Sequence, residues 1–284
     1  ETAAELRWLL RDSTIQTAHQ GDDHRVQDPY SLRCVPQVHG AARDALDQLR
    51  RVLDIELNSA TDNPLVFPEG GVVPEDVLAT GRGLVISGGN FHGEPVALAL
   101  DYAKLAIAEI GAISERRVAL LLDPRLNDGL PAFLGASSGL DSGLMILQYT
   151  AAALASESKT LAHPASADSI PTSANQEDHV SMGSVAARNA MTVLEHTERI
   201  VGIELICASQ GLVLRLDLQP ETAPGVGVAA AHARVRAQVA RLEEDREPGP
   251  DLESAYRLVH EAALVDLAGA PPTVSTSWLG PDPR

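Results

Sequence analysis

Apolar residues recur at helical spacing along most of the chain. Within 42–53, apolar side chains return at steps of three and four residues, which places them on one face of an amphipathic helix. Shorter stripes of the same kind cover 228–242 and 252–263. The pattern therefore predicts a mainly helical protein whose last helices are short.

Two longer segments, 94–122 and 143–161, are apolar almost all round and predict buried helices of a bundle. A third segment, 181–214, is longer and has its apolar residues on one side. The most apolar stretch, 96–113, contains Asp101, Lys104 and Glu109. A bilayer would make these three charges costly, so we expect a bundle helix and no membrane-spanning segment.

Glycine and proline clusters mark the loops. Residues 219–227 and 246–250 interrupt the helical pattern, and 68–83 predicts an exposed excursion. We therefore assign 1–215 to a helix-bundle domain and 216–284 to shorter C-terminal helices and a tail.

Composition narrows the class of protein. Only 3% of the 284 residues are aromatic, so aliphatic side chains must fill the core, as suits closely packed helices. Such helices also favour packing against further subunits. The net charge of −17 argues against nucleic acid and anionic membranes as partners. Two distant cysteines, Cys34 and Cys207, and no signal-peptide pattern predict a cytoplasmic protein.

One polar segment, Gln27-Asp-Pro-Tyr-Ser-Leu-Arg33, combines groups that suit a small carboxylate substrate. Asp28 before Pro29 predicts a helix start, and steps of three would put Gln27, Tyr30 and Arg33 within a sector of about 120°. A guanidinium grips carboxylates, and a phenol can move a proton. A surface helix start with a packed tyrosine and a paired arginine would look the same, so both interpretations stay open.

Two other polar segments flank predicted helices. Ser87-Gly-Gly-Asn-Phe-His92 lacks the lysine of a phosphate loop and predicts a tight turn. Ser173 and Gln176 have the spacing of a capping box, which would put Glu177 and Asp178 in the first turn of a helix. No metal-ligand spacing occurs among the histidines and cysteines, so we expect no catalytic metal.

Four segments, in the same order, resemble the histidine branch of the aromatic amino-acid lyases: Gln27-Asp-Pro-Tyr-Ser-Leu-Arg-Cys34, Glu56-Leu-Asn-Ser-Ala-Thr-Asp-Asn-Pro64, Ser87-Gly-Gly-Asn-Phe-His92 and Ser173-Ala-Asn-Gln-Glu-Asp-His-Val-Ser-Met182. The resemblance runs to about residue 270. It implies an all-α bundle of the fumarase/ammonia-lyase type, a homotetramer, and elimination of ammonia from L-histidine to give urocanate. The implied electrophile is a methylidene-imidazolone group that forms from an Ala-Ser-Gly tripeptide.

The resemblance also implies residue roles. Arg33 should hold the substrate carboxylate, and Tyr30 should assist proton transfer or stabilise charge. Gln27 should hydrogen-bond around the prosthetic group, beside which Phe91 should line the pocket. Glu177 should contact the amino group or the imidazole. A carboxylate suits a polar ring better than a phenyl ring, and phenylalanine lyases tend to have an amide at this place.

Several alternatives stay open. The chain could belong to a phenylalanine or tyrosine ammonia-lyase, to an aminomutase, or to an inactive scaffold. The fumarase-like lyases fit less well, because 168–175 lacks their loop lysine.

The tripeptide itself is missing from the 284 residues. The run Ala136-Ser-Ser-Gly139 has an extra serine and lies in the wrong part of the family pattern. The family's tripeptide lies upstream of the matching segments. We therefore expect these residues to be the C-terminal part of an ammonia-lyase that needs an N-terminal segment or polypeptide to act.

Overall fold

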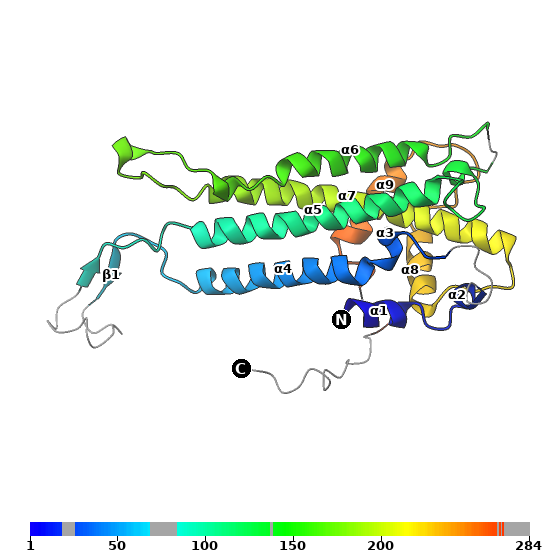
Figure 1. Ribbon diagram of the computed structural model, residues 1–284, viewed down its shortest axis with the longest axis horizontal. Helices are drawn as coiled ribbons and strands as arrows, with labels where there is room; N and C mark the ends of the chain where they lie inside the picture. The colour runs from blue at the N-terminus through cyan, green and yellow to red at the C-terminus, as the bar shows by residue number, and fades with distance from the viewer. Residues whose placement is uncertain (19–25, 69–83, 137–138, 266, 268, 270–284) are drawn as a thin grey trace. The chain divides into compact units, whose positions relative to one another are not determined.

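The computed structural model describes residues 1–18, 26–68, 84–136, 139–265, 267 and 269. Helices dominate this part of the chain (Figure 1). They are α1 (Thr2–Leu9), α2 (Thr14–Ala18), α3 (Tyr30–Arg33), α4 (Val35–Leu57), α5 (Glu94–Leu122), α6 (Met145–Leu161), α7 (Gly183–Leu218), α8 (Val226–Arg236) and α9 (Gly249–His260). The predicted all-α class is confirmed.

The long helices lie where the apolar pattern predicts them. α5 has the predicted bounds, whereas α6 begins at Met145 and α7 runs from Gly183 to Leu218. α8 ends earlier than its stripe suggests, at Arg236. Val239 is nevertheless buried, because apolar residues of the following turns also enter the core.

The chain forms two compact units. Unit 1 comprises Glu1–Arg43, Ile107–Thr160 and Val193–Arg284. Unit 2 comprises Asp44–Ala106 and Leu161–Thr192. The boundary that we predict at residue 215, between the helix-bundle domain and the C-terminal helices, remains a prediction.

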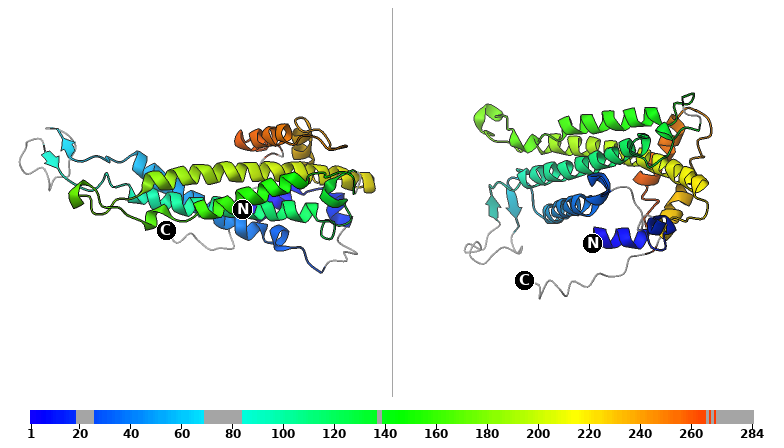
Figure 2. Two further views of the ribbon diagram at one scale, coloured as in Figure 1. Left: turned by 90° about the horizontal axis from the view of Figure 1, so that it is seen from above. Right: turned by 45° about the vertical axis from the view of Figure 1, so that its right-hand side comes forward.

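The core of unit 1 is built from aliphatic side chains of five helices, α5 to α9. Its fully buried members include Val118, Leu122, Ala151, Ile200, Ile203, Val235 and Ala255. α9 lies beside α7 (Figure 2). A Cβ added at Gly202 in α7 would lie 3.1 Å from the backbone nitrogen of Tyr256 in α9. The absence of a side chain at Gly202 therefore allows the two helices to approach closely.

Unit 2 contains two short strands that the apolar pattern does not predict. β1 (Leu65–Phe67) pairs antiparallel with β2 (Leu84–Ile86), and Val66 faces Val85. At the base of this ladder, Asn63 Oδ1 accepts hydrogen bonds from Ser87 Oγ and Gly88 N, both at 3.1 Å. The predicted excursion at 68–83 lies outside the described residues except for residue 68, and so does the predicted tail from residue 271.

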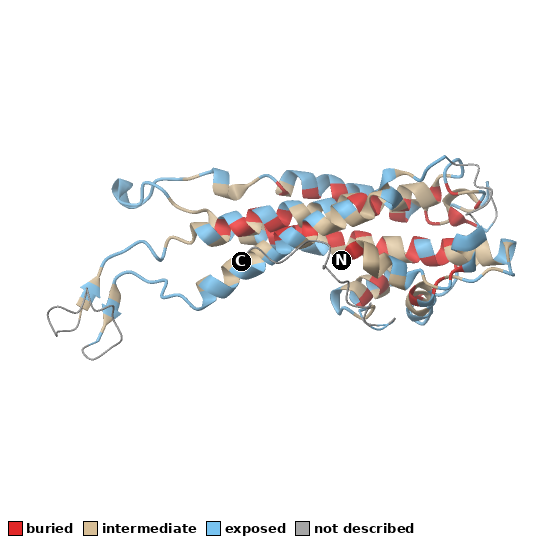
Figure 3. Cartoon of the chain, turned by 60° about the horizontal axis from the view of Figure 1, so that its bottom comes forward, coloured by how far each residue is buried: buried red, intermediate tan, exposed pale blue. Residues whose placement is uncertain are grey.

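Buried residues concentrate in the long helices, and most residues of the loop that precedes α7 are exposed (Figure 3). Each strand has one exposed residue between two of intermediate burial. No helix in the described part of the chain combines the length and apolarity needed to cross a bilayer. The exposed loops carry most of the polar segments that the sequence singles out.

Candidate active site

Three of the predicted site residues meet at α3, in unit 1. Arg33 Nη1 donates a hydrogen bond to Gln27 Oε1. The guanidinium carbon of Arg33 lies 4.9 Å from the centre of the Tyr30 ring, a cation–π contact. Arg33 is thus oriented by an amide and by a phenol. Its remaining N–H groups can meet a carboxylate.

The helix that holds these residues is shorter than predicted. α3 covers only Tyr30–Arg33, and Pro29 precedes it with an extended backbone (φ −56°, ψ 153°). Gln27 therefore lies outside the helix, and the predicted common helical sector is wrong for it. Its hydrogen bond to Arg33 nevertheless brings the two side chains together.

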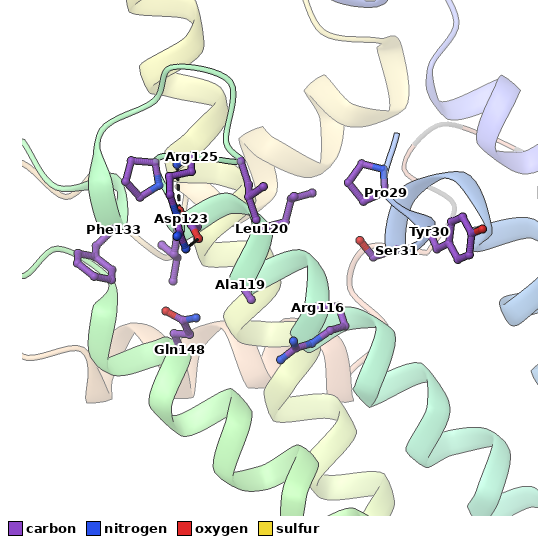
Figure 4. A pocket seen from close by; sticks show the side chains of 13 residues that line it. Pro29, Tyr30, Ser31, Arg116, Ala119, Leu120, Asp123, Arg125, Phe133 and Gln148 are labelled. Atoms are coloured by element: carbon purple, nitrogen blue, oxygen red, sulfur yellow. Dashed lines mark hydrogen bonds and ion pairs between the residues drawn. The ribbon is translucent and has the colours of Figure 1, made fainter. Parts of the chain in front are cut away.

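Tyr30 borders an open cleft of about 950 Å³ within unit 1. Arg116 and Leu120 of α5 lie between Gln148 on one side and the α3 residues on the other (Figure 4). The Tyr30 side chain is 70% exposed. Its phenol is accessible to a ligand or to another chain.

The cleft also contains an ion pair. Hydrogen bonds from Arg125 lower the pKa of Asp123 in its wall to about 2. Asp123 is therefore ionised at neutral pH and is paired with a cation of its own.

A partly buried ion pair that the sequence analysis did not single out supports α3. Arg117 in α5 donates to both carboxylate oxygens of Glu204 in α7, with Nη2 at 2.7 Å from Oε2. Ser114 Oγ donates to the same carboxylate at 2.6 Å. A third donor of Arg117, Nη1, lies 3.4 Å from the carbonyl oxygen of Ser31. In the sequence, Arg117 and Glu204 are charged residues within apolar helices, and this pattern could have marked each of them as a candidate.

Phe91 lies in unit 2, on the predicted tight turn. His92 N donates to the carbonyl of Gly89 at 3.0 Å, which closes the turn and confirms that prediction. Phe91 is 53% exposed. Because its ring is exposed, Phe91 is available to line a pocket together with residues of other segments.

Glu177 also lies in unit 2, but the predicted capping box is wrong. Ser173–Asn175 forms a single 3-10 turn with positive φ at all three residues, and α7 begins only at Gly183. Glu177 instead pairs with Thr172: Thr172 N donates to Glu177 O at 2.9 Å, and Thr172 Oγ1 donates to the Glu177 carboxylate. Glu177 is therefore presented by a hairpin, not by the first turn of a helix.

The five predicted residues thus fall into two groups. In unit 1, Arg33 contacts both Gln27 and Tyr30. Phe91 and Glu177 stand on neighbouring loops of unit 2. His92, next to Phe91, contacts His179, close to Glu177 in sequence. Among the described residues, no group of three or more His, Cys, Asp or Glu side chains could hold a metal ion.

Comparison with known proteins gives a consistent match. The family described as aromatic amino acid lyase matches residues 1–237. The histidine ammonia-lyase of Natranaerobius thermophilus is 51% identical over 265 residues, which is 93% of this chain and 49% of that protein. The histidine ammonia-lyase of Anaeromyxobacter dehalogenans is 54% identical over the same shares. The chain therefore spans about half the length of the curated relatives that it matches.

Solved structures agree. The histidine ammonia-lyase of Trypanosoma cruzi is 44% identical, with a TM-score of 0.80 over 98% of this chain and 49% of that one. A tyrosine aminomutase from Streptomyces globisporus is 34% identical, with a TM-score of 0.80 over 96% of this chain and 52% of that one. The bundle architecture predicted from the resemblance is confirmed by these neighbours.

Proposed function

The chain belongs to the aromatic amino acid lyase family, and from this premise we propose that it carries part of the active site of an ammonia-lyase acting on L-histidine. The products would be urocanate and ammonia. The observation that carries the proposal is the paired arrangement of Arg33 with Gln27 and Tyr30, in a chain 51% identical to a histidine ammonia-lyase.

Arg33 would bind the carboxylate of the substrate. Gln27 and the ring of Tyr30 hold its guanidinium before the substrate arrives. A planar guanidinium offers two parallel N–H donors, which match the two oxygens of a carboxylate. Such preorganisation reduces the conformational entropy lost on binding.

The elimination breaks the Cα–N and Cβ–H bonds and forms the Cα=Cβ double bond. The exposed hydroxyl of Tyr30 would exchange a proton with a reacting group or stabilise charge close to the carboxylate site. With the carboxylate held by Arg33, this donor would lie near the substrate's α-carbon.

The family uses a methylidene-imidazolone, which supplies the electrophile that activates the substrate for loss of ammonia. The chain's own residues suit such a group. Gln27 and Tyr30 offer exposed hydrogen-bond donors, and Phe91 offers an exposed ring that would pack beside the group. The Ala-Ser-Gly tripeptide that forms the group is not among the 284 residues, so we propose that another segment or polypeptide supplies it.

Glu177 would select histidine. Thr172 holds its carboxylate by a hydrogen bond, so the side chain has a fixed direction. A carboxylate can accept a hydrogen bond from an imidazole N–H or pair with an amino group, and it would be left unpaired by a phenyl ring. A tyrosine aminomutase shares the fold at 34% identity, so return of the amine to the β-carbon is the second candidate outcome.

We also propose that a second copy of the chain covers α5, within a homotetramer. Leu98, Tyr102 and Leu105 are 55%, 51% and 47% exposed. Spacings of four and three residues place them on one side of the helix, and we call them the α5 stripe. An exposed apolar stripe of this kind is typical of a surface that another chain covers. Light scattering should give the mass of four assembled chains.

The test of the function uses a protein that also contains the tripeptide segment. Its mass should be two water molecules below that of its sequence, and it should form urocanate from L-histidine, followed by ultraviolet absorbance. Glu177→Gln should reduce the preference for histidine over phenylalanine, whereas the neighbouring Asp178→Asn should not. An unchanged preference in Glu177→Gln would reject the assigned role of Glu177. A β-amino acid product would favour the aminomutase.

A further inference from the structure

The hairpin that carries Glu177 is an exposed segment closed by short-range hydrogen bonds. Besides the pairing of Thr172 with Glu177, Val180 N donates to Ser169 Oγ at 2.9 Å. At its tip, Ser173, Ala174 and Asn175 have φ values of 47°, 52° and 70°. Non-glycine residues in the left-handed region store strain of about 1–3 kcal/mol each. A hairpin with a strained tip needs contacts from outside to keep one conformation.

One such contact comes from the turn that carries Phe91. His92 Nε2 lies 3.0 Å from the carbonyl oxygen of His179, and the two rings meet edge to face with centroids 5.6 Å apart. A carbonyl oxygen can only accept, so His92 Nε2 must carry the proton and donate it. His179 Nδ1 in turn lies 3.4 Å from Ser169 Oγ, at the base of the hairpin.

Packing reinforces this junction. Gly93 has φ +78°, and a Cβ added there would lie 3.6 Å from Ser181 Oγ. A Cβ added at Gly183 would meet Ala97 Cβ and Ser181 Oγ, both at 3.6 Å. The end of the hairpin therefore lies directly against the start of α5. His92 donates the side-chain hydrogen bond that joins the two segments.

We propose that His92 is a positioning residue for Glu177. Its hydrogen bond to the His179 carbonyl fixes the hairpin beside the turn of Phe91, so that the carboxylate and the aromatic ring face one substrate together. His92 acts through the backbone of the hairpin and does not touch the substrate. This inference rests on the proposed role of Glu177 in selecting histidine.

The experiment is a double-mutant cycle in the complete enzyme, with kcat/KM measured for histidine and for phenylalanine. His92→Ala should lower the ratio of the two constants on the order of tenfold, as loss of one orienting hydrogen bond predicts. His92→Ala combined with Glu177→Gln should lower it no further than Glu177→Gln alone. His92→Gln, whose amide can also donate, should restore most of the ratio.

The matched control is His260→Ala. His260 also makes one side-chain hydrogen bond of 3.0 Å, to Glu198, but belongs to unit 1. The His260→Ala variant should leave the ratio of kcat/KM for histidine to kcat/KM for phenylalanine unchanged. A merely structural role of His92 would lower both constants alike and leave the ratio as it was, which would overturn the proposal.

A second measurement separates failure of this inference from failure of the proposed function. Amide hydrogen exchange of residues 169–180 should accelerate in His92→Ala and not in His260→Ala. If exchange accelerates but Glu177→Gln leaves the ratio unchanged, the positioning holds and the assigned role of Glu177 fails. If Glu177→Gln lowers the ratio while His92→Ala changes neither the ratio nor the exchange, the positioning role is rejected and the function stands.

Discussion

Lys104 Nζ lies 2.6 Å from Asp101 Oδ1, and the two side chains are 0% and 4% exposed. Lys104 also donates to the carbonyl of His163 at 3.0 Å, and Asp101 Oδ2 accepts from Ser166 N at 2.7 Å. The buried pair therefore connects α5 to the segment that leads into the Glu177 hairpin. Because the charges neutralise each other, an apolar helix can contain both.

Removal of the lysine should destabilise the protein strongly. Lys104→Met leaves the Asp101 carboxylate buried without its cation, and this should cost about 3–5 kcal/mol of unfolding free energy. Urea unfolding measures the loss. The double variant Lys104→Met with Asp101→Leu should recover most of it, since no charge then remains buried. A single variant as stable as the parent protein would contradict this view.

The same pair predicts a dependence on acid. Burial tends to raise the pKa of Asp101, but hydrogen bonds from Lys104 and Ser166 outweigh burial and hold this pKa below its ordinary value. A lowered pKa in the folded state gives stability that is present above the unfolded pKa of about 3.9 and is lost as pH falls below it. Asp101→Asn should reduce this acid dependence in urea unfolding followed from neutral pH downwards.

Arg33→Lys should weaken substrate binding in the complete enzyme. Lysine keeps the charge but loses the planar pair of donors, so KM for histidine should rise roughly tenfold. Steady-state kinetics provide the measurement. Arg51→Lys is the control, because Arg51 also donates to a glutamine amide, that of Gln48. Similar KM values for the two variants would exclude Arg33 from the carboxylate site.

His39 should make stability fall in mild acid. Burial lowers the pKa of His39, and the charge of Arg117 adds to this shift. Glu204 opposes it, and Arg43 supports it. Since the folded state binds its proton less readily than the unfolded state, stability is complete above about pH 6.5 and declines as pH falls towards the folded pKa.

Unfolding in urea at about pH 7.5 and about pH 5.5 brackets this change. His39→Leu should remove part of the decline. It also removes a buried Nε2 that has no hydrogen-bond partner. An equal decline in the variant and in the parent protein would show that other groups cause it.

Gly202→Ala should loosen the contact between α7 and α9. The added Cβ would lie 3.1 Å from Tyr256 N and 3.2 Å from the carbonyl carbon of Ala255, both rigid backbone atoms. Overpacking of this kind costs about 1–3 kcal/mol. Gly211→Ala in the same helix meets side chains only, the nearest at 3.5 Å. Gly211→Ala should raise the free energy of unfolding by up to about 1 kcal/mol, because alanine has a higher helix propensity than glycine. Thermal unfolding of the two variants checks the opposite signs.

The long helices could be predicted from the sequence because their signal is local and repeated. α5 carries apolar residues along its whole length and begins and ends as predicted. β1 and β2 could not be found in this way, because each has three residues and depends on pairing with the other across 68–83.

The residues of the candidate site remain a prediction from the sequence, whereas their local geometry departs from the predicted one. Ser173 and Gln176 have the spacing of a helix cap, yet the pairing of Thr172 with Glu177 turns this segment into a hairpin. This short-range pairing, between residues five positions apart, prevailed over the preference for a helix start. Arg117 was missed for a different reason: its partner Glu204 lies far along the chain, and spacing cannot show the contact.

If the proposed assembly forms on the α5 stripe, stability depends on concentration as well as on sequence. Leu98, Tyr102 and Leu105 are about half exposed in the single chain. In the proposed assembly, a bound copy therefore acts on this helix as a ligand does, and mass action links folding to association. Dilution would then lower the melting temperature of unit 2. The same chain would be more stable at high protein concentration than at low protein concentration.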